Sequence, residues 1–328
     1  MTTIELMKLL RELSSFAAIW LSAWLLLFGV LYLAYPLIRK VLVRWHPATA
    51  GNALLGMMAL PFCASLLATS MLFGGLLEMN VVTMHYHSAD CESQFPRLES
   101  YWTVAAVLGL SSVALLTMFG KFVSQLLSAR ALRERLMMVS DARSEWFLLP
   151  NDEKLVFTLG WLSNDIFITA GMLRECSDRD LAIILEHERA HVERRDNLRL
   201  LFGRLMLLAV PASLTRGMQE DFHLFTEASC DFATAAKHGA LDVAETLLRV
   251  QRLVPGHFRY FDRTVVSAFT GSEVENRVRL LVDADNRKLA RPFHLWPFLL
   301  LLVAFSVALV DPMHHAAEVL LGGIQAVF

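Results

Sequence analysis

Two histidines and a glutamate stand at a spacing that suits metal-assisted hydrolysis. His187 and His191 lie four residues apart, so on a helix both imidazoles project from one face, and Glu188 follows the first histidine. In this H-E-x-x-H arrangement the histidines bind zinc and the glutamate serves as general base. Zinc lowers the pKa of a bound water to roughly 7, and the glutamate can accept that water's proton. The motif predicts a zinc peptidase; the alternative is a solvated helix face that carries two histidines by chance.

The residues around this motif predict a helix that begins shortly before it. Ser177 followed three residues later by Asp180 resembles a capping box, and the run DLAIILEHERAHVER carries an apolar side. A strand is expected directly upstream at 165–169, ended by Gly171. Such a strand either aligns an extended substrate along an exposed sheet edge or merely packs on the helix, and the sequence leaves both interpretations open.

A third metal ligand has to come from farther along the chain. Zinc in a peptidase takes three protein ligands and leaves the fourth position to water, and no third histidine closely follows His191. Glu227 in the run FTEASCDFA is the best candidate, with His223 as its rival and an ordinary surface glutamate as the alternative. Asp231 comes one helical turn after Glu227. It either accepts an N–H from a ligating histidine, fixing its tautomer, or is a surface charge.

The composition predicts a membrane protein. Of the 328 residues 55% are hydrophobic, and the mean hydropathy is +0.46, well above that of ordinary soluble domains. The net charge of −2 indicates no strong attraction to nucleic acid, and the four scattered cysteines form no disulfide framework. Uncharged runs long enough to cross about 30 Å of hydrocarbon predict four transmembrane helices, at about 16–38, 53–77, 101–120 and 292–310.

Basic residues set the expected orientation of these spans. They crowd the segments 39–52 and 121–291, whereas the loop 78–100 is mainly acidic. By the positive-inside rule the basic segments are cytoplasmic, and both termini and the acidic loop face outward. We expect a mainly α membrane protein with four transmembrane helices and a cytoplasmic α+β, gluzincin-like zinc peptidase domain inserted between the third and fourth. The expected division is a membrane region at 1–120, the peptidase domain at 121–291, and the fourth span with a short tail at 292–328.

Two longer motifs resemble those of the integral-membrane antirepressor metallopeptidases of the BlaR/MecR type. HERAHVERRD matches H-E-x-x-H-x-x-R-x-D, and EASCD matches E-x-S-C-D. The layout of three spans, a zinc domain and a fourth span is also similar, over about residues 1–310. The resemblance implies that His187, His191 and Glu227 bind zinc and that Glu188 is the catalytic base. The same motifs contain the residues expected to support these ligands, namely Arg194, Asp196 and Asp231.

The resemblance also implies a location and a substrate. Such proteins lie in the bacterial cytoplasmic (inner) membrane, respond to an outside signal, cleave themselves and promote cleavage of a cytoplasmic winged-helix repressor. We expect the penicillin-binding sensor domain of those receptors to be lacking, because only residues 311–328 follow the fourth span and they contain no S-x-x-K motif. A separate sensor protein or the outward loops would then receive the signal. The expected partners are a protein substrate, the lipid bilayer and a second copy in a homodimer, without direct contact to nucleic acid.

Two other functions stay open. A quality-control or prenyl-protein protease of the HtpX or CAAX type also combines membrane spans, H-E-x-x-H and a downstream glutamate. A membrane receptor with a non-catalytic zinc site is the alternative from another class. Glu188 argues against the receptor, because a purely structural site needs no base.

Three smaller questions remain at this stage. The residue that stabilises the oxyanion is open among His223, His257, Arg194 and Tyr260. The run from Ser267 to Gly271 is either a self-cleavage loop or an ordinary connection. A group of outward residues either binds a soft metal or consists of ordinary polar loop residues: His85, His87, Asp90, Cys91, Glu92, His314 and His315.

Overall fold

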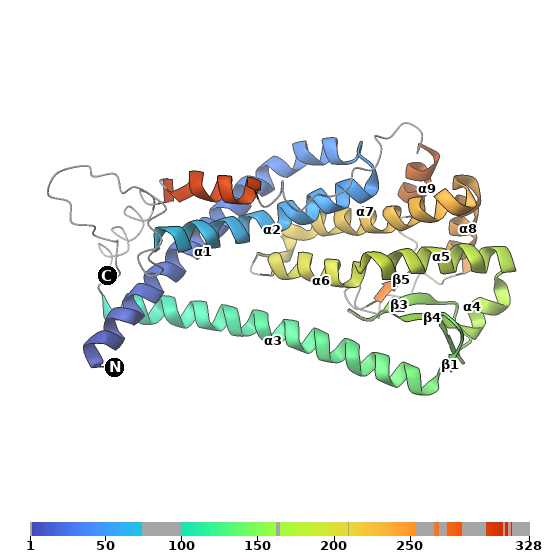
Figure 1. Cartoon of the computed structure of the whole chain (residues 1–328), viewed down its shortest axis with the longest axis horizontal. Coiled ribbons are helices and arrows are strands. Elements are labelled where there is room, and N and C mark those ends of the chain that lie inside the picture. Colours follow the sequence, from blue (N-terminus) through green and yellow to red (C-terminus); the bar gives the residue numbers. More distant parts are fainter. Residues whose placement is uncertain are drawn as a thin grey trace. The chain divides into compact units, whose positions relative to one another are not determined.

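The computed structural model of the chain (Figure 1) combines long helices with one small sheet. It describes residues 2–73, 100–161, 165–208, 210–253, 266–268, 274–283, 300–310, 312–313 and 316. The chain divides into two compact units. The first consists of Met1–Pro36, Gly56–Phe119 and His294–Phe328, and the second of Leu37–Leu55 and Gly120–Phe293. All the residues of the H-E-x-x-H motif belong to the second unit.

Three helices are long and apolar enough to cross a membrane. They are α1 (Thr3–Leu42), α2 (Pro47–Leu72) and α3 (Tyr101–Val139), and they carry the three spans expected in the first part of the chain. At 1.5 Å per residue α1 and α3 are each about 60 Å long, roughly twice the thickness of the hydrocarbon core. Each of these two helices therefore continues well beyond the segment that a bilayer covers.

The expected fourth span is described only in part. Leu300–Val310 forms a shorter apolar helix, and 292–299 lie outside the described residues, so the span stays a prediction. Within the first unit Val310 joins a buried cluster that includes Ala18 and Ala68. The C-terminal end of this helix thus packs with residues of α1 and α2.

A five-stranded sheet lies in the second unit. Its strands are β1 (Asp141–Ala142), β2 (Phe147–Leu149), β3 (Val156–Leu159), β4 (Asp165–Thr169) and β5 (Val266–Ala268), in the spatial order β1-β2-β4-β3-β5. β2 and β4 run parallel, and the other neighbours are antiparallel. The expected strand at 165–169 is therefore present as β4. Of the two interpretations that the sequence left open, packing on the helix holds, because β4 contacts α5, and the exposed substrate-binding edge is wrong, because β2 and β3 pair with both sides of β4.

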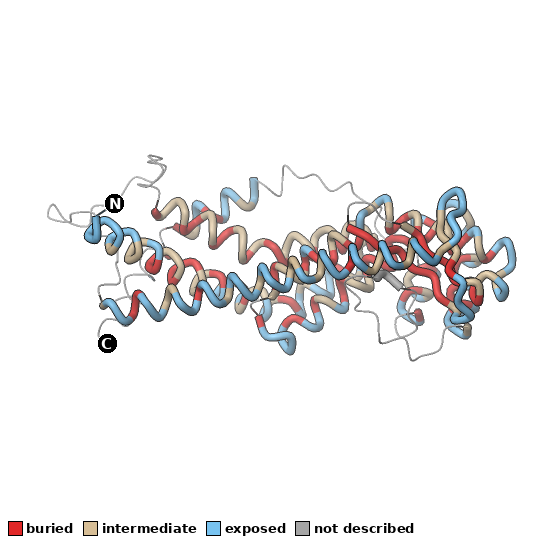
Figure 2. The backbone as a smooth tube through the Cα atoms, turned by 90° about the horizontal axis from the view of Figure 1, so that it is seen from below, coloured by how far each residue is buried: buried red, intermediate tan, exposed pale blue. Residues whose placement is uncertain are grey.

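Both faces of the sheet are covered, and alternate residues of each strand serve the two faces. On one face Phe157, Leu159 and Phe167 pack with the C-terminal part of α3, through Leu132 and Leu136. The other face is covered by the helices that follow the sheet in the chain, and its buried core includes Val156, Ile166, Ile168, Ile183, Ile184 and Leu247. Figure 2 shows buried backbone through the strands and the helices beside them. β3 and β4 read as nearly continuous hydrophobic runs because both of their faces are covered, whereas both residues of β1 are exposed.

The helix with the histidines is α5 (Asp178–Arg194), and it contacts β3 and β4 on one side and α7 (Ala212–His238) on another, as Figure 1 shows. Its predicted capping box is confirmed: the Ser177 hydroxyl accepts from the backbone of Asp180, whose carboxylate accepts from the backbone of Ser177. A short helix not expected from the sequence, α4 (Ala170–Glu175), separates β4 from α5. Its second residue, Gly171, stands where a Cβ would lie 2.0 Å from the carbonyl oxygen of Asp152.

Three more helices complete the second unit: α6 (Asp196–Met206), α8 (Ala240–Leu253) and α9 (Val274–Val282). The unit also includes 37–55, which the sequence-based division placed with the membrane region. Two polar contacts are among those that join this segment to the rest of the unit. The Arg39 guanidinium donates two hydrogen bonds to Asp221 on α7, and Arg199 on α6 donates to the Asn52 side chain at 2.5 Å.

Candidate metal centre

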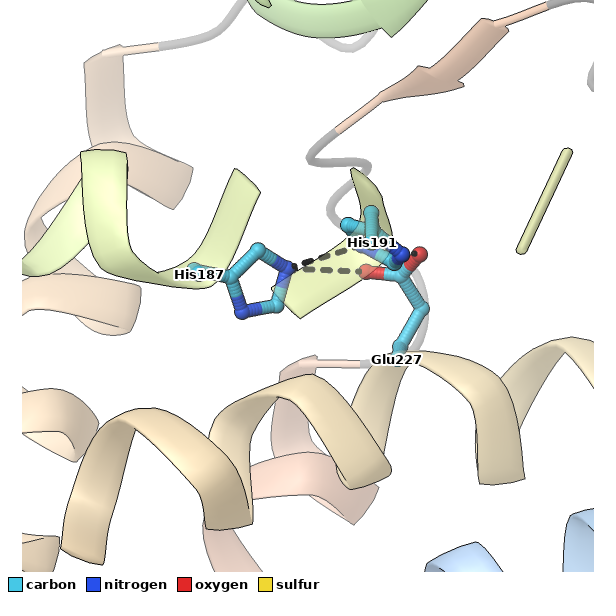
Figure 3. A group of neighbouring side chains, drawn as sticks. All are labelled: His187, His191 and Glu227. Atoms are coloured by element: carbon cyan, nitrogen blue, oxygen red, sulfur yellow. Dashed lines mark hydrogen bonds and ion pairs between the residues drawn. The ribbon is translucent and has the colours of Figure 1, made fainter. Parts of the chain in front are cut away.

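The two histidines of the motif meet a glutamate from a neighbouring helix. The Nε2 atoms of His187 and His191 lie 3.1 Å apart on one face of α5. Glu227 approaches from α7, with Oε1 at 3.4 Å from His191 Nε2 and Oε2 at 3.6 Å from His187 Nε2 (Figure 3). All three side chains are buried, and their donor atoms lie within 4.8 Å of one another. Of the two ligands considered from the sequence, Glu227 rather than His223 is in this group.

The donor set fits a zinc ion. Two imidazoles and one carboxylate make up the ligand class of a catalytic zinc site, which leaves one position to water. A second group near it joins His191 to Asp196 and Cys230. Burial and the nearby Asp196 raise the pKa of the Cys230 thiol well above its usual value, so its sulfur stays protonated and donates to Asp196. Because Asp196 already accepts from Cys230 and lies 3.0 Å from Nδ1 of His191, this second group supports a ligand from behind, and the group with Glu227 is the better metal site.

Each histidine has a carboxylate behind its other ring nitrogen. Asp231 Oδ1 lies 3.1 Å from Nδ1 of His187, and Asp196 Oδ2 lies 3.0 Å from Nδ1 of His191. The second contact depends on Arg195, whose left-handed conformation (φ 53°) ends α5 and turns the chain so that Asp196 lies beside the last turn of the helix. These carboxylates hold the proton of each ring on Nδ1 and leave Nε2 free to ligate, as outer carboxylates do in zinc sites.

An arginine that the sequence analysis did not single out completes the site. Arg277 on α9 is only 1% exposed, and it contacts both Asp231 and Glu227. In the sequence Arg277 belongs to the run ENRVRLLV, which contains a second arginine, Arg279. The side chain of Arg279 is mostly exposed. Helical spacing alone offered a signal: Val274 and Leu281, the other buried residues of α9, lie on the same side as Arg277.

The pKa values follow from burial and from these charges. Burial opposes the charged form of His187, but the contacts with Asp231 and Glu227 outweigh it and raise the pKa of this imidazole to about 9. Burial acts to raise the pKa of Glu227, yet the nearby His191 and Arg277 hold it well below its usual range. Glu227 is therefore an ionised carboxylate at neutral pH. His187 carries a proton that a binding metal ion displaces, so binding releases protons.

Glu188 is buried beside the ligands and is held by the sheet. Its Oε2 accepts a hydrogen bond of 2.5 Å from the Thr158 hydroxyl on β3. Burial raises the pKa of Glu188 above its usual value, although the nearby histidines and the Thr158 hydroxyl act to lower it. The Asn197 side chain donates to the carbonyl oxygens of Thr158 and Gly160, each at 3.1 Å, and so ties the end of β3 to α6. A carboxylate with a raised pKa next to the ligands suits a general base.

A family comparison covers this part of the chain. The model of peptidase family M48 matches residues 149–265. The match takes in β3, β4 and the helices from α4 to α8, and with them His187, Glu188, His191 and Glu227. It supports a metallopeptidase, and together with the three apolar helices it supports a membrane-anchored one. No curated protein matches the chain significantly.

Other residues considered from the sequence have different positions. The Arg194 Nε donates to both oxygens of Asp196, at 3.3 and 3.2 Å, so this arginine backs the carboxylate that holds His191. His223 lies on α7 outside the group of three donors. Several candidates lie outside the described residues: the oxyanion candidates His257 and Tyr260, and the outward residues His85, His87, Asp90, Cys91, Glu92, His314 and His315.

Proposed function

We propose that this chain is a membrane-embedded zinc endopeptidase that hydrolyses a protein on the cytoplasmic side of the membrane. The observation that carries the proposal is the buried convergence of His187, His191 and Glu227 beside Glu188. When bound, a zinc ion would lower the pKa of a water molecule and polarise the scissile carbonyl. The match to peptidase family M48 over 149–265 supports the same activity.

The chain's own residues would divide the reaction between them. Glu188 accepts a proton from the attacking water on one of its carboxylate oxygens and passes it to the nitrogen of the leaving amine. Thr158 orients this carboxylate through the hydrogen bond to Oε2. Asp231 and Asp196 keep the rings of His187 and His191 oriented during turnover.

The strands that pair with β3 limit the ways in which a substrate would bind beside Thr158. β3, which supplies Thr158, pairs with β4 on one side and with the three-residue strand β5 on the other. A substrate added as an extended strand beside Thr158 would therefore take the place that β5 occupies, or pair with β5 itself. This pairing favours self-cleavage as a second activity, because β5 includes Ser267 and Ala268 of the candidate loop. The rest of that loop, 269–271, lies outside the described residues.

A transcriptional repressor is the substrate class that the motifs favour. HERAHVERRD and EASCD are similar to the motifs of BlaR/MecR antirepressors, and a winged-helix repressor is their cytoplasmic target. We further propose the bacterial inner membrane as location, with 121–291 on the cytoplasmic side and both termini outward. A homodimer and a separate sensor protein belong to the same proposal. The runner-up is an HtpX/CAAX-type processing or quality-control protease, and the third candidate is a non-catalytic zinc receptor.

A reconstituted cleavage assay tests the proposal. The full chain and its Glu188→Gln variant are compared in proteoliposomes for zinc content and for cleavage of three substrates: the chain itself, a repressor encoded beside it and an unfolded membrane protein. We expect both proteins to bind one zinc, and Glu188→Gln to cut at least about 100-fold more slowly, because it lacks the base. Cleavage of the unfolded protein alone would favour the runner-up. Zinc binding without any cleavage by the parent would favour the receptor.

A further inference from the structure

Arg277 places a full positive charge between two acidic side chains of the metal centre. Its Nε and Nη2 donate to the two oxygens of Asp231, at 2.7 and 2.6 Å, in a bidentate arrangement. The remaining nitrogen, Nη1, lies 3.1 Å from Oε2 of Glu227. All three guanidinium nitrogens thus contact carboxylates, and the side chain is 1% exposed.

The two carboxylates that Arg277 contacts have different relations to the metal. Glu227 is itself one of the three candidate ligands, whereas Asp231 lies 3.1 Å from Nδ1 of a second ligand, His187. One guanidinium therefore acts on two of the three ligands, directly on the first and through a carboxylate on the second. The third ligand, His191, depends on Asp196 with Arg194 and Arg199.

We propose that Arg277 is a positioning residue of the metal centre: its planar guanidinium fixes the Glu227 carboxylate and, through Asp231, the His187 ring in the arrangement that receives the metal. This inference rests on the proposed zinc site. It adds an element that the family match, which ends at residue 265, does not include. Arg277 lies on α9. The contacts of α9 with α7 and α8 hold the guanidinium beside the ligands.

A purely electrostatic role for Arg277 makes the opposite prediction. A buried cation repels a divalent metal ion, so removing its charge would strengthen zinc binding. Positioning has the reverse effect, because without the guanidinium the Glu227 carboxylate and the His187 ring lose their fixed orientations before the metal arrives. A lysine retains the charge but presents no planar fork, so Arg277→Lys separates geometry from charge.

The test uses the full chain in detergent, stripped of metal, with the variants Arg277→Lys and Arg277→Gln. Arg279→Gln is the matched control, since Arg279 lies on the same helix and is exposed in a pair with Glu275. Zinc affinity is measured by competition with a chromophoric chelator, and the visible absorption of bound Co²⁺ reports the coordination geometry. Thermal unfolding of the metal-free proteins reports the fold. None of these readouts depends on peptidase activity.

We expect Arg277→Lys to bind zinc about 10- to 100-fold more weakly than the parent and to give a changed Co²⁺ spectrum, the range usual for loss of a residue behind a metal ligand. Arg279→Gln should match the parent within about twofold. If Arg277→Lys binds zinc as tightly as the parent with the same Co²⁺ spectrum, or if Arg277→Gln binds more tightly, the inference is wrong. A lysine variant that fails to fold even with saturating zinc also overturns it, since Arg277 would then serve the fold as a whole. A parent that binds no zinc instead refutes the proposed function.

Discussion

At the scale of single residues, a local sequence pattern predicts some members of the site and misses others. His187, Glu188 and His191 are predictable because four-residue spacing on one helix fixes their common face. Glu227 and Asp231 are also predictable, because they lie one helical turn apart and therefore on one face of their helix. Arg277 is not, because it is 46 residues from Asp231 and only the packing of α9 on α7 brings the two together. Helical spacing places Arg277, rather than Arg279, on the side of Val274 and Leu281, but it does not show which acidic side chains that side of α9 meets.

We expect the Thr158 hydroxyl to affect kcat and to leave zinc affinity unchanged. It donates to Oε2 of Glu188, which is not one of the three candidate ligands. Loss of a hydrogen bond to a charged group costs about 1.5–3 kcal/mol, so Thr158→Val should lower kcat by roughly 10-fold or more, with zinc affinity unchanged.

Thr234→Val is the matched control for this substitution. Thr234 is also buried, but its hydroxyl donates to the carbonyl oxygen of Cys230 within α7. Its variant should keep the parent's kcat. Steady-state kinetics on the same substrate compares the three proteins, and equal kcat for Thr158→Val and the parent would remove Thr158 from the mechanism.

At the scale of elements, tertiary pairing limits what the sequence predicts. β4 is recognisable because four residues of high β-propensity, Ile166 to Thr169, come shortly before a glycine, and α5 because a capping box precedes an apolar stripe. β5 has three residues and no periodicity, and it exists through its pairing with β3. Because β5 pairs with β3, it is β5 and not β3 or β4 that forms this edge of the described sheet. An edge is a property of the assembled sheet, so the sequence of one strand does not reveal it.

The start of α5 gives a prediction about stability. The Asp180 carboxylate accepts from Ser177, Thr246 and Arg249. Burial acts to raise the pKa of Asp180, but these hydrogen bonds and the Arg249 charge outweigh it and lower the pKa. Because the folded pKa is below the unfolded one, the ionised carboxylate stabilises the fold above about pH 4, and this contribution is lost as the pH falls through the folded pKa.

Asp180→Asn should therefore lower the free energy of unfolding by about 1–2 kcal/mol at pH 7, as loss of a helix cap does. The difference from the parent should shrink as the pH falls below about 4. Denaturant unfolding followed by circular dichroism at several pH values measures both. Asp178→Asn, an exposed change in the same turn, should stay within about 0.5 kcal/mol of the parent. A constant difference between Asp180→Asn and the parent down to pH 3 would contradict the assignment.

At the scale of the whole molecule, the second unit is built from two separate stretches of sequence. Composition and charge predicted the membrane helices and a polar domain after α3. Both quantities are summed over many residues, so they do not depend on any single contact. They did not predict that 37–55 join that domain, since this depends on contacts between distant residues, such as Arg39 with Asp221 and Asn52 with Arg199. These partners lie 182 and 147 residues apart in the chain.

A chain of polar contacts leads from α2 to the metal site. Asn52 accepts from Arg199, whose Nη1 lies 3.4 Å from Asp196, and Asp196 holds His191. Asn52→Ala should weaken zinc binding about threefold, less than the 10- to 100-fold expected for Asp196→Asn, which removes the charge next to the ligand. Chelator competition on the full chain measures both effects. Gln219→Ala, which removes a polar contact with Thr215 on α7, should leave the affinity unchanged. Equal affinities for Asn52→Ala and the parent would show that the chain of contacts ends at Arg199.

The position of Arg277 near the end of the second unit has a consequence for the protein's synthesis. The ribosome adds about 5–20 residues per second, so the 46 residues from Asp231 to Arg277 take several seconds. During that time the nascent chain already contains both histidines, Glu188 and Glu227, but not the guanidinium that neutralises the carboxylates around them. The candidate metal centre thus gains the side chain that links two of its ligands only after all three ligands have been translated.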